Sequence, residues 1–157
     1  MRRRFLVCAG FVVLASAQIA AARAISPDRP IDRAMTLTFR MKATGSYFND
    51  VNPSGPSLGD TLASQNEILK NGTQVGHVGS TCAVTGKQAV CTAVAWLPQG
   101  QLALVGQLPL RVFSGSAATI HLAVTGGTRA FRRVRGDATI VIQGGSKPTT
   151  LTLRLSP

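Results

Sequence analysis

The chain has 157 residues, of which 45% are hydrophobic and 5% are aromatic, and its formal net charge is +11. This length and apolar content suit one domain with its own core. The basic excess would suit an anionic partner. However, the sequence has no recognisable nucleic-acid-binding motif and too few aromatic residues for a base-stacking platform. We therefore expect no nucleic acid among its partners.

The N-terminus is typical of an export signal. Residues 2–4 are arginines, residues 5–17 are apolar, and residues 22–24 offer a small-residue cleavage site. The apolar run is short for a membrane span, and both general and twin-arginine export leaders fit it. We expect residues 1–24 to be a signal peptide, the mature protein to be secreted or periplasmic, and no integral membrane anchor to remain. Without residues 1–24 the chain has 13 basic and 6 acidic residues.

Two cysteines follow the leader, Cys82 and Cys91. An even number of cysteines in an exported protein favours a disulfide. Residues 86–87 are Gly-Lys and predict a two-residue hairpin turn that pairs Thr85 with Gln88. The same register sets the two cysteines opposite each other at a non-hydrogen-bonded position, where Cα atoms lie about 4.5 Å apart. We predict a disulfide here, and no metal site, because further ligands at metal-binding spacing are lacking.

Strand-like runs and turn signals alternate along the rest of the chain. After an extended arm at residues 25–34, strands are expected at residues 35–42, 60–69, 74–85, 88–97, 101–108, 117–124, 131–142 and 149–155. A loop is expected at 43–58, and no helical periodicity is sustained. The pattern predicts an all-β domain over residues 35–157, an eight-stranded antiparallel up-and-down (calycin-like) barrel. An open two-sheet sandwich is the alternative.

The segment QAVCTAVAWL at residues 88–97 is apolar on both faces. One face can fill a barrel, and the other needs cover, which a second copy of the chain would supply. We therefore expect a homo-oligomer, a dimer or a trimer. Phe39, Trp96 and Phe131 are expected in the core rather than stacked on a ligand.

Three segments carry a family resemblance: SLGDTLASQNEIL at 57–69, GHVGSTC at 76–82, and LAVTGGTRAF with the following Arg-Gly at 122–136. Their order and spacing resemble the allene oxide cyclase and dirigent superfamily of small β-barrels. The resemblance implies a barrel, trimeric in plant members, whose lumen binds a small hydrophobic molecule without a cofactor. Such barrels steer cyclisation or radical coupling by confining the substrate. The alternative is a non-catalytic secreted barrel that binds a lipid or polyphenol or serves as a structural module.

Residue by residue, the resemblance supports the barrel fold more than the reactions of the plant cyclases and dirigent proteins. Asn66 matches an asparagine that helps to hold a water in the plant cyclases, and Cys82 matches a pocket cysteine. Arg40 and Lys42 occupy places where the plant cyclases have a glutamate and an asparagine, and the dirigent aspartate of that strand is missing. Arg129 stands where the family pattern has glycine.

Four side chains are further candidates. Asp60 would be a general acid or base if buried, and its simpler interpretation is a carboxylate that accepts backbone N–H groups in a turn. Asn66 would fix a ligand oxygen or water, or else bond within the strands. His77 is a ligand-binding candidate, although it and His121 are more simply strand residues than catalysts. Asp60 and Asn66 are thus the catalytic candidates.

Four arginines form the densest charge cluster: Arg129, Arg132, Arg133 and Arg135. They would hold a carboxylate or an anionic polymer through bidentate contacts. The simpler interpretation, which we favour, is a solvated rim of arginines alternating along a strand, which discourages edge pairing.

Overall fold

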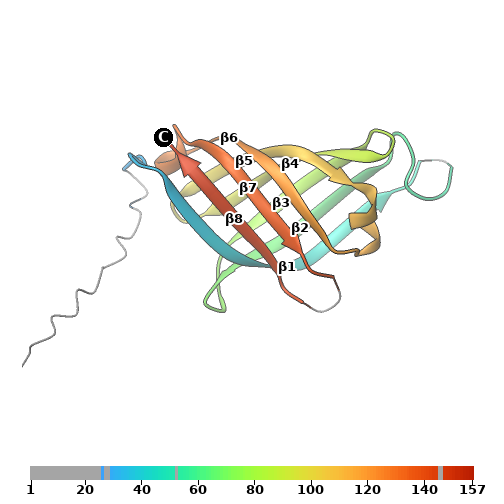
Figure 1. Cartoon of the computed structure of the whole chain (residues 1–157), viewed down its shortest axis with the longest axis horizontal. Coiled ribbons are helices and arrows are strands. Elements are labelled where there is room, and N and C mark those ends of the chain that lie inside the picture. The colour runs from blue at the N-terminus through green and yellow to red at the C-terminus, as the bar shows by residue number, and fades with distance from the viewer. Residues whose placement is uncertain (1–25, 27–28, 52, 145–146) are drawn as a thin grey trace, which may run out of the picture.

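The structure is a computed structural model that describes residues 26, 29–51, 53–144 and 147–157. Eight strands follow one another around a closed antiparallel barrel in chain order (Figure 1). They are β1 (Met35–Asn49), β2 (Thr61–Lys70), β3 (Thr73–Val84), β4 (Gln88–Leu97), β5 (Gly100–Pro109), β6 (Ala118–Gly127), β7 (Arg135–Ile142) and β8 (Thr149–Ser156). Two short 3-10 helices follow β5 and β6: η1 (Leu110–Ser114) and η2 (Arg129–Phe131). Within the described ranges, no helix is long and apolar enough to cross a membrane.

The predicted eight-stranded up-and-down barrel is confirmed. It closes because β1 pairs with both β2 and β8: Phe39 lies opposite Leu151 on one side, and Met41 lies opposite Ile68 on the other. Closure leaves no free sheet edge, which excludes the open sandwich. The predicted signal peptide at residues 1–24 lies outside the described residues.

Two strand boundaries differ from the prediction by four or more residues. β1 does not end at Lys42 but continues to Asn49, because a bulge between Ala43 and Gly45 absorbs the glycine and lets pairing with β2 resume. β7 begins at Arg135 rather than at Phe131, which lies in η2. The helix η1, between β5 and β6, was not expected from the sequence.

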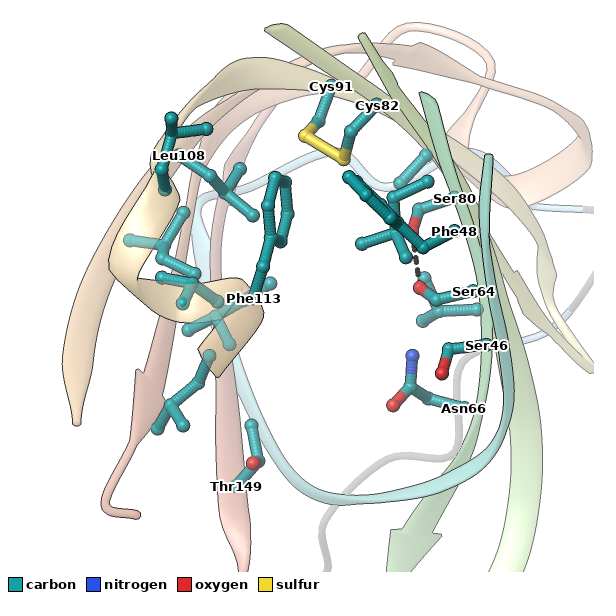
Figure 2. A pocket seen from close by; sticks show the side chains of 18 of the residues that line it. Ser46, Phe48, Ser64, Asn66, Ser80, Cys82, Cys91, Leu108, Phe113 and Thr149 are labelled. Atoms are coloured by element: carbon teal, nitrogen blue, oxygen red, sulfur yellow. Dashed lines mark hydrogen bonds between the residues drawn. A yellow bond between two sulfur atoms is a disulfide. The ribbon is translucent and has the colours of Figure 1, made fainter. Parts of the chain in front are cut away.

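The hairpin register predicted around residues 86–87 is confirmed. The backbone N–H of Thr85 donates to the Gln88 carbonyl at 2.8 Å, and Cys82 pairs with Cys91 in the ladder. The two cysteines form a disulfide with their Cα atoms 4.0 Å apart. The bond staples β3 to β4 on the inner side of the barrel (Figure 2).

The barrel is packed solid at the end where β1 begins and β8 ends. Phe131 of η2 is fully buried there and packs with Phe39, Leu102 and Leu153 in the main core cluster. A Cβ at Gly127 would collide with the Phe131 side chain and the Gln101 carbonyl, so the second glycine of the Gly-Gly pair permits this packing. The predicted core positions of Phe39 and Phe131 are confirmed.

The predicted burial of Trp96 is wrong. Its side chain lies on the outer face of β4 and is 43% exposed, because Ala95 and Leu97 take the inward positions of that strand.

Candidate ligand-binding cavity

The other end of the lumen holds a cavity of about 790 Å³ (Figure 2). All eight strands, η1 and the loop after β1 contribute to its lining. The volume lies within the usual range for small-molecule sites. The interior of the barrel is therefore filled by side chains at the η2 end and contains a cavity at the η1 end.

The cavity has two unlike walls. The β1–β3 wall carries a row of hydroxyls: Ser46 is paired with Ser64, and Ser64 with Ser80. The Ser64 and Ser80 Oγ atoms lie 2.7 Å apart in a hydrogen bond. The opposite wall is aliphatic and is formed by Leu104, Leu108, Val112, Ile120, Leu122, Ile140 and Ile142. A ligand would thus meet hydrogen-bonding groups along one edge and apolar surface along the other.

Asn66 joins the polar wall because strand residues two apart share a face, which sets it beside Ser64 on the inner side of β2. Its amide points into the cavity (Figure 2). No hydrogen bond to the Asn66 side chain is found among the described residues. The amide therefore offers two donors and one acceptor to whatever occupies the cavity.

Asp60 lies elsewhere. It is fully buried just before β2 and does not line the cavity. Its carboxylate accepts the backbone N–H of Val51 at 2.8 Å and of Ser57 at 2.6 Å. These bonds, that of Val51 first, hold the pKa of the Asp60 carboxyl below its ordinary value, against the opposing effect of burial. The arrangement is that of a turn-forming carboxylate that shapes the loop at the mouth of the cavity.

The mouth contains residues that the sequence analysis missed. Asp50 is the ionisable side chain among the described lining residues, and its Oδ2 accepts the Gly55 N–H at 2.9 Å. Phe48 and Phe113 face each other across the opening, with ring centroids 6.2 Å apart (Figure 2). Residues 46, 48 and 50 all line the cavity, at the two-residue spacing of a strand that has one face inward. This spacing could have predicted the end of β1, but the glycine at position 45 made the stretch resemble a loop.

The disulfide also lines the cavity. Cys82 and Cys91 are 3% and 4% exposed and pack against Leu62, Leu108, Phe113 and Leu110. The position that matches a pocket cysteine in the cyclases is thus a pocket residue here too, in the form of a disulfide sulfur.

The histidines lie outside the cavity. His77 is exposed on the outer face of β3, where its ring stacks on Trp96 with centroids 5.3 Å apart. His121 is exposed on β6 and lies 3.5 Å from the Thr139 hydroxyl. No group of three metal-ligating side chains occurs in the part of the chain that the structure describes.

The four clustered arginines are exposed, as a solvated rim requires, but they do not alternate along a strand edge, so that part of the expectation is wrong. Arg129 lies in η2, Arg132 and Arg133 follow it in the turn, and only Arg135 lies on a strand. Arg129 has a positive φ of 55°. The position where the family pattern has glycine is thus left-handed in this chain.

No protein-family model and no curated protein sequence gives a significant match to the chain. Solved structures do match. A pyocyanin demethylase has a TM-score of 0.68 and 23% identity, over 78% of this chain and 100% of the demethylase. AbnU, an exo-specific intermolecular Diels-Alderase, has a TM-score of 0.59 and 14% identity, over 79% of this chain and 98% of AbnU. The pterocarpan synthase dirigent protein GePTS1 has a TM-score of 0.58 and 14% identity, over 87% and 96%. The chain therefore has the barrel fold that dirigent proteins share with Diels-Alderase and cyclase barrels.

Proposed function

We propose that this protein binds a small, mainly apolar metabolite in its cavity and steers the cyclisation or coupling of that molecule by holding it in one conformation. The observation that carries the proposal is the cavity of about 790 Å³ with one polar and one aliphatic wall. The aliphatic wall favours transfer of apolar surface out of water, and the polar wall fixes orientation. A reaction that needs only a particular folded geometry gains rate from such confinement.

The chemistry of the polar wall limits the class of ligand that the cavity can bind. Ser46, Ser64, Ser80 and Asn66 are all uncharged, and the carboxylate of Asp50 lies at the mouth. These groups suit a neutral molecule with carbonyl or hydroxyl oxygens along one edge. An amide N–H donated by Asn66 would also stabilise negative charge that develops on a carbonyl oxygen during a cycloaddition or ring closure. The fold shared with a Diels-Alderase and a pterocarpan synthase supports this class of reaction.

A second candidate function is carriage of a lipid or polyphenol without chemistry. The observation that favours it is the lack of a histidine, lysine or buried carboxylate among the described lining residues. A carrier needs only the two walls, whereas an enzyme would also accelerate a reaction of the bound molecule.

Native mass spectrometry of protein recovered from its host tests both proposals, because a co-purifying ligand shows its class by mass. That ligand, or a panel of phenazines, flavonoids and fatty acids, is then titrated by calorimetry. Asn66→Leu should weaken binding of the true ligand roughly 5- to 10-fold through the loss of one hydrogen bond. The matched control is Gln65→Leu, one residue along β2 on the outer face, which should leave binding unchanged.

Turnover of the bound ligand separates the two functions. Conversion to a cyclised or coupled product faster than in buffer supports the enzyme, and unchanged ligand supports the carrier. Equal loss of affinity in the Asn66 and Gln65 variants, or no binding of any hydrophobic molecule, would contradict the cavity proposal.

We further propose that the protein is exported and assembles through strands β3–β6. These four consecutive strands contain no Asp, Glu, Lys or Arg, and Val90, Val94 and Trp96 are 39%, 46% and 43% exposed on β4. Contact between copies would cover this apolar face. Val94→Arg should reduce the mass of the assembly measured by light scattering, whereas Thr36→Arg on β1 should not. A monomer in the unsubstituted protein would contradict this proposal.

A further inference from the structure

Six arginines gather at the closed end of the barrel, away from the cavity mouth. They come from two segments, residues 29–33 and 129–135, which are far apart in the sequence. The backbone N–H of Ile31 donates to the Ala130 carbonyl at 3.0 Å and thereby holds the N-terminal arm against η2. We call this set the arginine patch: Arg29, Arg33, Arg129, Arg132, Arg133 and Arg135, all exposed.

Four of these six arginines form no ion pair within the described residues. The two segments contain one acidic residue, Asp32, which pairs with Arg29 at 3.5 Å on the exposed surface. Arg129 and Arg135 donate to the backbone carbonyls of Pro98 and Val134. The Val134 carbonyl leaves the charge of Arg135 in place, and Arg33, Arg132 and Arg133 form no ion pair within the described residues. The end of the barrel therefore carries a concentrated positive field.

The patch fits phosphate groups spread over a surface. Arginine binds phosphate oxygens bidentately, and six of them stand over a whole end of the barrel. The apolar side chains of the two segments, Ile31, Phe131 and Val134, are buried. The patch therefore offers charge without an aromatic platform for bases and without an apolar side chain to insert into a membrane.

The position of the cavity favours a membrane as the source of these phosphates. The mouth of the cavity lies at the opposite end, so a barrel seated on its arginine patch keeps the cavity open to the aqueous side. Figure 1 shows the beginning of β1 and the C-terminus together at one end.

We propose that the arginine patch docks this barrel, by electrostatics alone, on a membrane surface rich in anionic phospholipids. The inference does not depend on what the cavity binds. Each arginine that reaches an anionic membrane surface strengthens binding about fivefold, and added salt weakens the attraction by screening it.

The test measures co-sedimentation of the folded protein with vesicles of phosphatidylcholine alone and of phosphatidylcholine mixed with phosphatidylglycerol. The protein should bind only the anionic vesicles and should dissociate as salt is added. R132Q/R133Q should weaken this binding roughly 25-fold. Neither side chain makes a hydrogen bond or ion pair within the described residues, so the variant should keep the thermal midpoint of the parent.

The matched control removes the same charge from the other end. K87Q/K147Q neutralises two exposed lysines near the cavity mouth, and binding should change less than about twofold. Equal weakening by both variants would show that net charge alone is responsible and would overturn the proposal. So would binding to phosphatidylcholine alone, no binding to anionic vesicles, or tighter binding to heparin or duplex DNA than to the vesicles.

Discussion

The Oγ atoms of Ser64 and Ser80 lie 2.7 Å apart, on neighbouring strands and on the wall of the cavity. Ser46 continues the row on β1 and Ala93 continues it on β4, so the hydroxyls stop where the disulfide side of the lumen begins. The row is a direct consequence of register, because one slip by a residue would turn all three serines to the outer face. It makes the polar wall of the cavity as rigid as the sheet itself.

The serine pair should couple energetically. Ser64→Ala and Ser80→Ala should each lower the free energy of unfolding by about 0.5–1.5 kcal/mol. The double variant should cost less than the sum, because the second alanine removes a hydroxyl that has already lost its partner. Chemical denaturation of the four proteins measures the coupling, and strict additivity would show that the two hydroxyls bind water independently.

Asp60 should govern acid stability. Its folded pKa is lowered by the Val51 and Ser57 N–H groups, while its unfolded pKa is about 3.9. Between these values the unfolded chain binds more protons than the folded one, so stability is fully present above the unfolded pKa and is lost as the pH falls through the folded pKa. Asp60→Asn should lower the thermal midpoint at neutral pH and flatten its fall at acid pH.

The control for Asp60 is Asp137→Asn. Asp137 is 53% exposed and pairs with Arg154 at 3.1 Å on the surface, so its removal should change stability by less than about 1 kcal/mol. Thermal melts followed by circular dichroism across the acid range measure both variants. A parallel fall of midpoint with pH in the Asp60 variant and its parent would contradict the assignment.

The sequence predicts those features that depend on local pattern. The hairpin turn at Gly86 determines which residues of β3 and β4 pair, so the pairing of Cys82 with Cys91 follows from the number of residues on each side of the turn. The sequence does not predict the extension of β1, because a bulge between Ala43 and Gly45 interrupts the alternation of inward and outward residues. A strand search that relies on strict alternation ends at such a bulge. The burial of Phe131 in η2 and the exposure of Trp96 depend on how the ends and outer faces of the barrel pack, which no local pattern encodes.

The same distinction holds within the cavity. Asn66 was a candidate from the family resemblance, and the structure points it into the lumen, whereas Asp60 and His77 lie outside the cavity. The Phe48–Phe113 pair joins residues from β1 and η1 that are far apart in the sequence. Only the closure of the barrel brings them together at the mouth.

The disulfide should contribute to both stability and binding. Its loop is short, and the chain-entropy estimate for such a loop is about 2–3 kcal/mol. Cys82→Ala with Cys91→Ala should therefore lower the free energy of unfolding by that amount. Because both sulfurs line the cavity, the variant should also weaken binding of the cavity ligand, whereas vesicle binding should stay unchanged.

Intact-mass measurement checks the bond itself. Alkylation of the mature protein without reductant should add no mass at these cysteines, and reduction should expose two thiols. Modification of both thiols before reduction would contradict the bond in the native protein.

The backbone of Arg129 should be a site of strain that glycine relieves. Its φ of 55° lies in the left-handed region, which costs an ordinary L-residue roughly 1–2 kcal/mol. Arg129→Gly should raise the free energy of unfolding by about 1 kcal/mol, less the contribution of the Arg129 contact with the Pro98 carbonyl. Arg129→Ala removes the same contact and keeps the backbone cost, so the difference between the two variants isolates the backbone effect.

Arg132 is the matched control, because it has ordinary right-handed angles of φ −58° and ψ −20°. Glycine there relieves no strain and adds freedom to the unfolded chain, so Arg132→Gly should destabilise the protein by about 0.5–1 kcal/mol. Denaturant titrations of the three variants should therefore give opposite signs at two neighbouring turn positions. Equal destabilisation by both glycine variants would contradict the prediction. It would mean that the side-chain contacts of Arg129 contribute more to stability than its left-handed backbone costs.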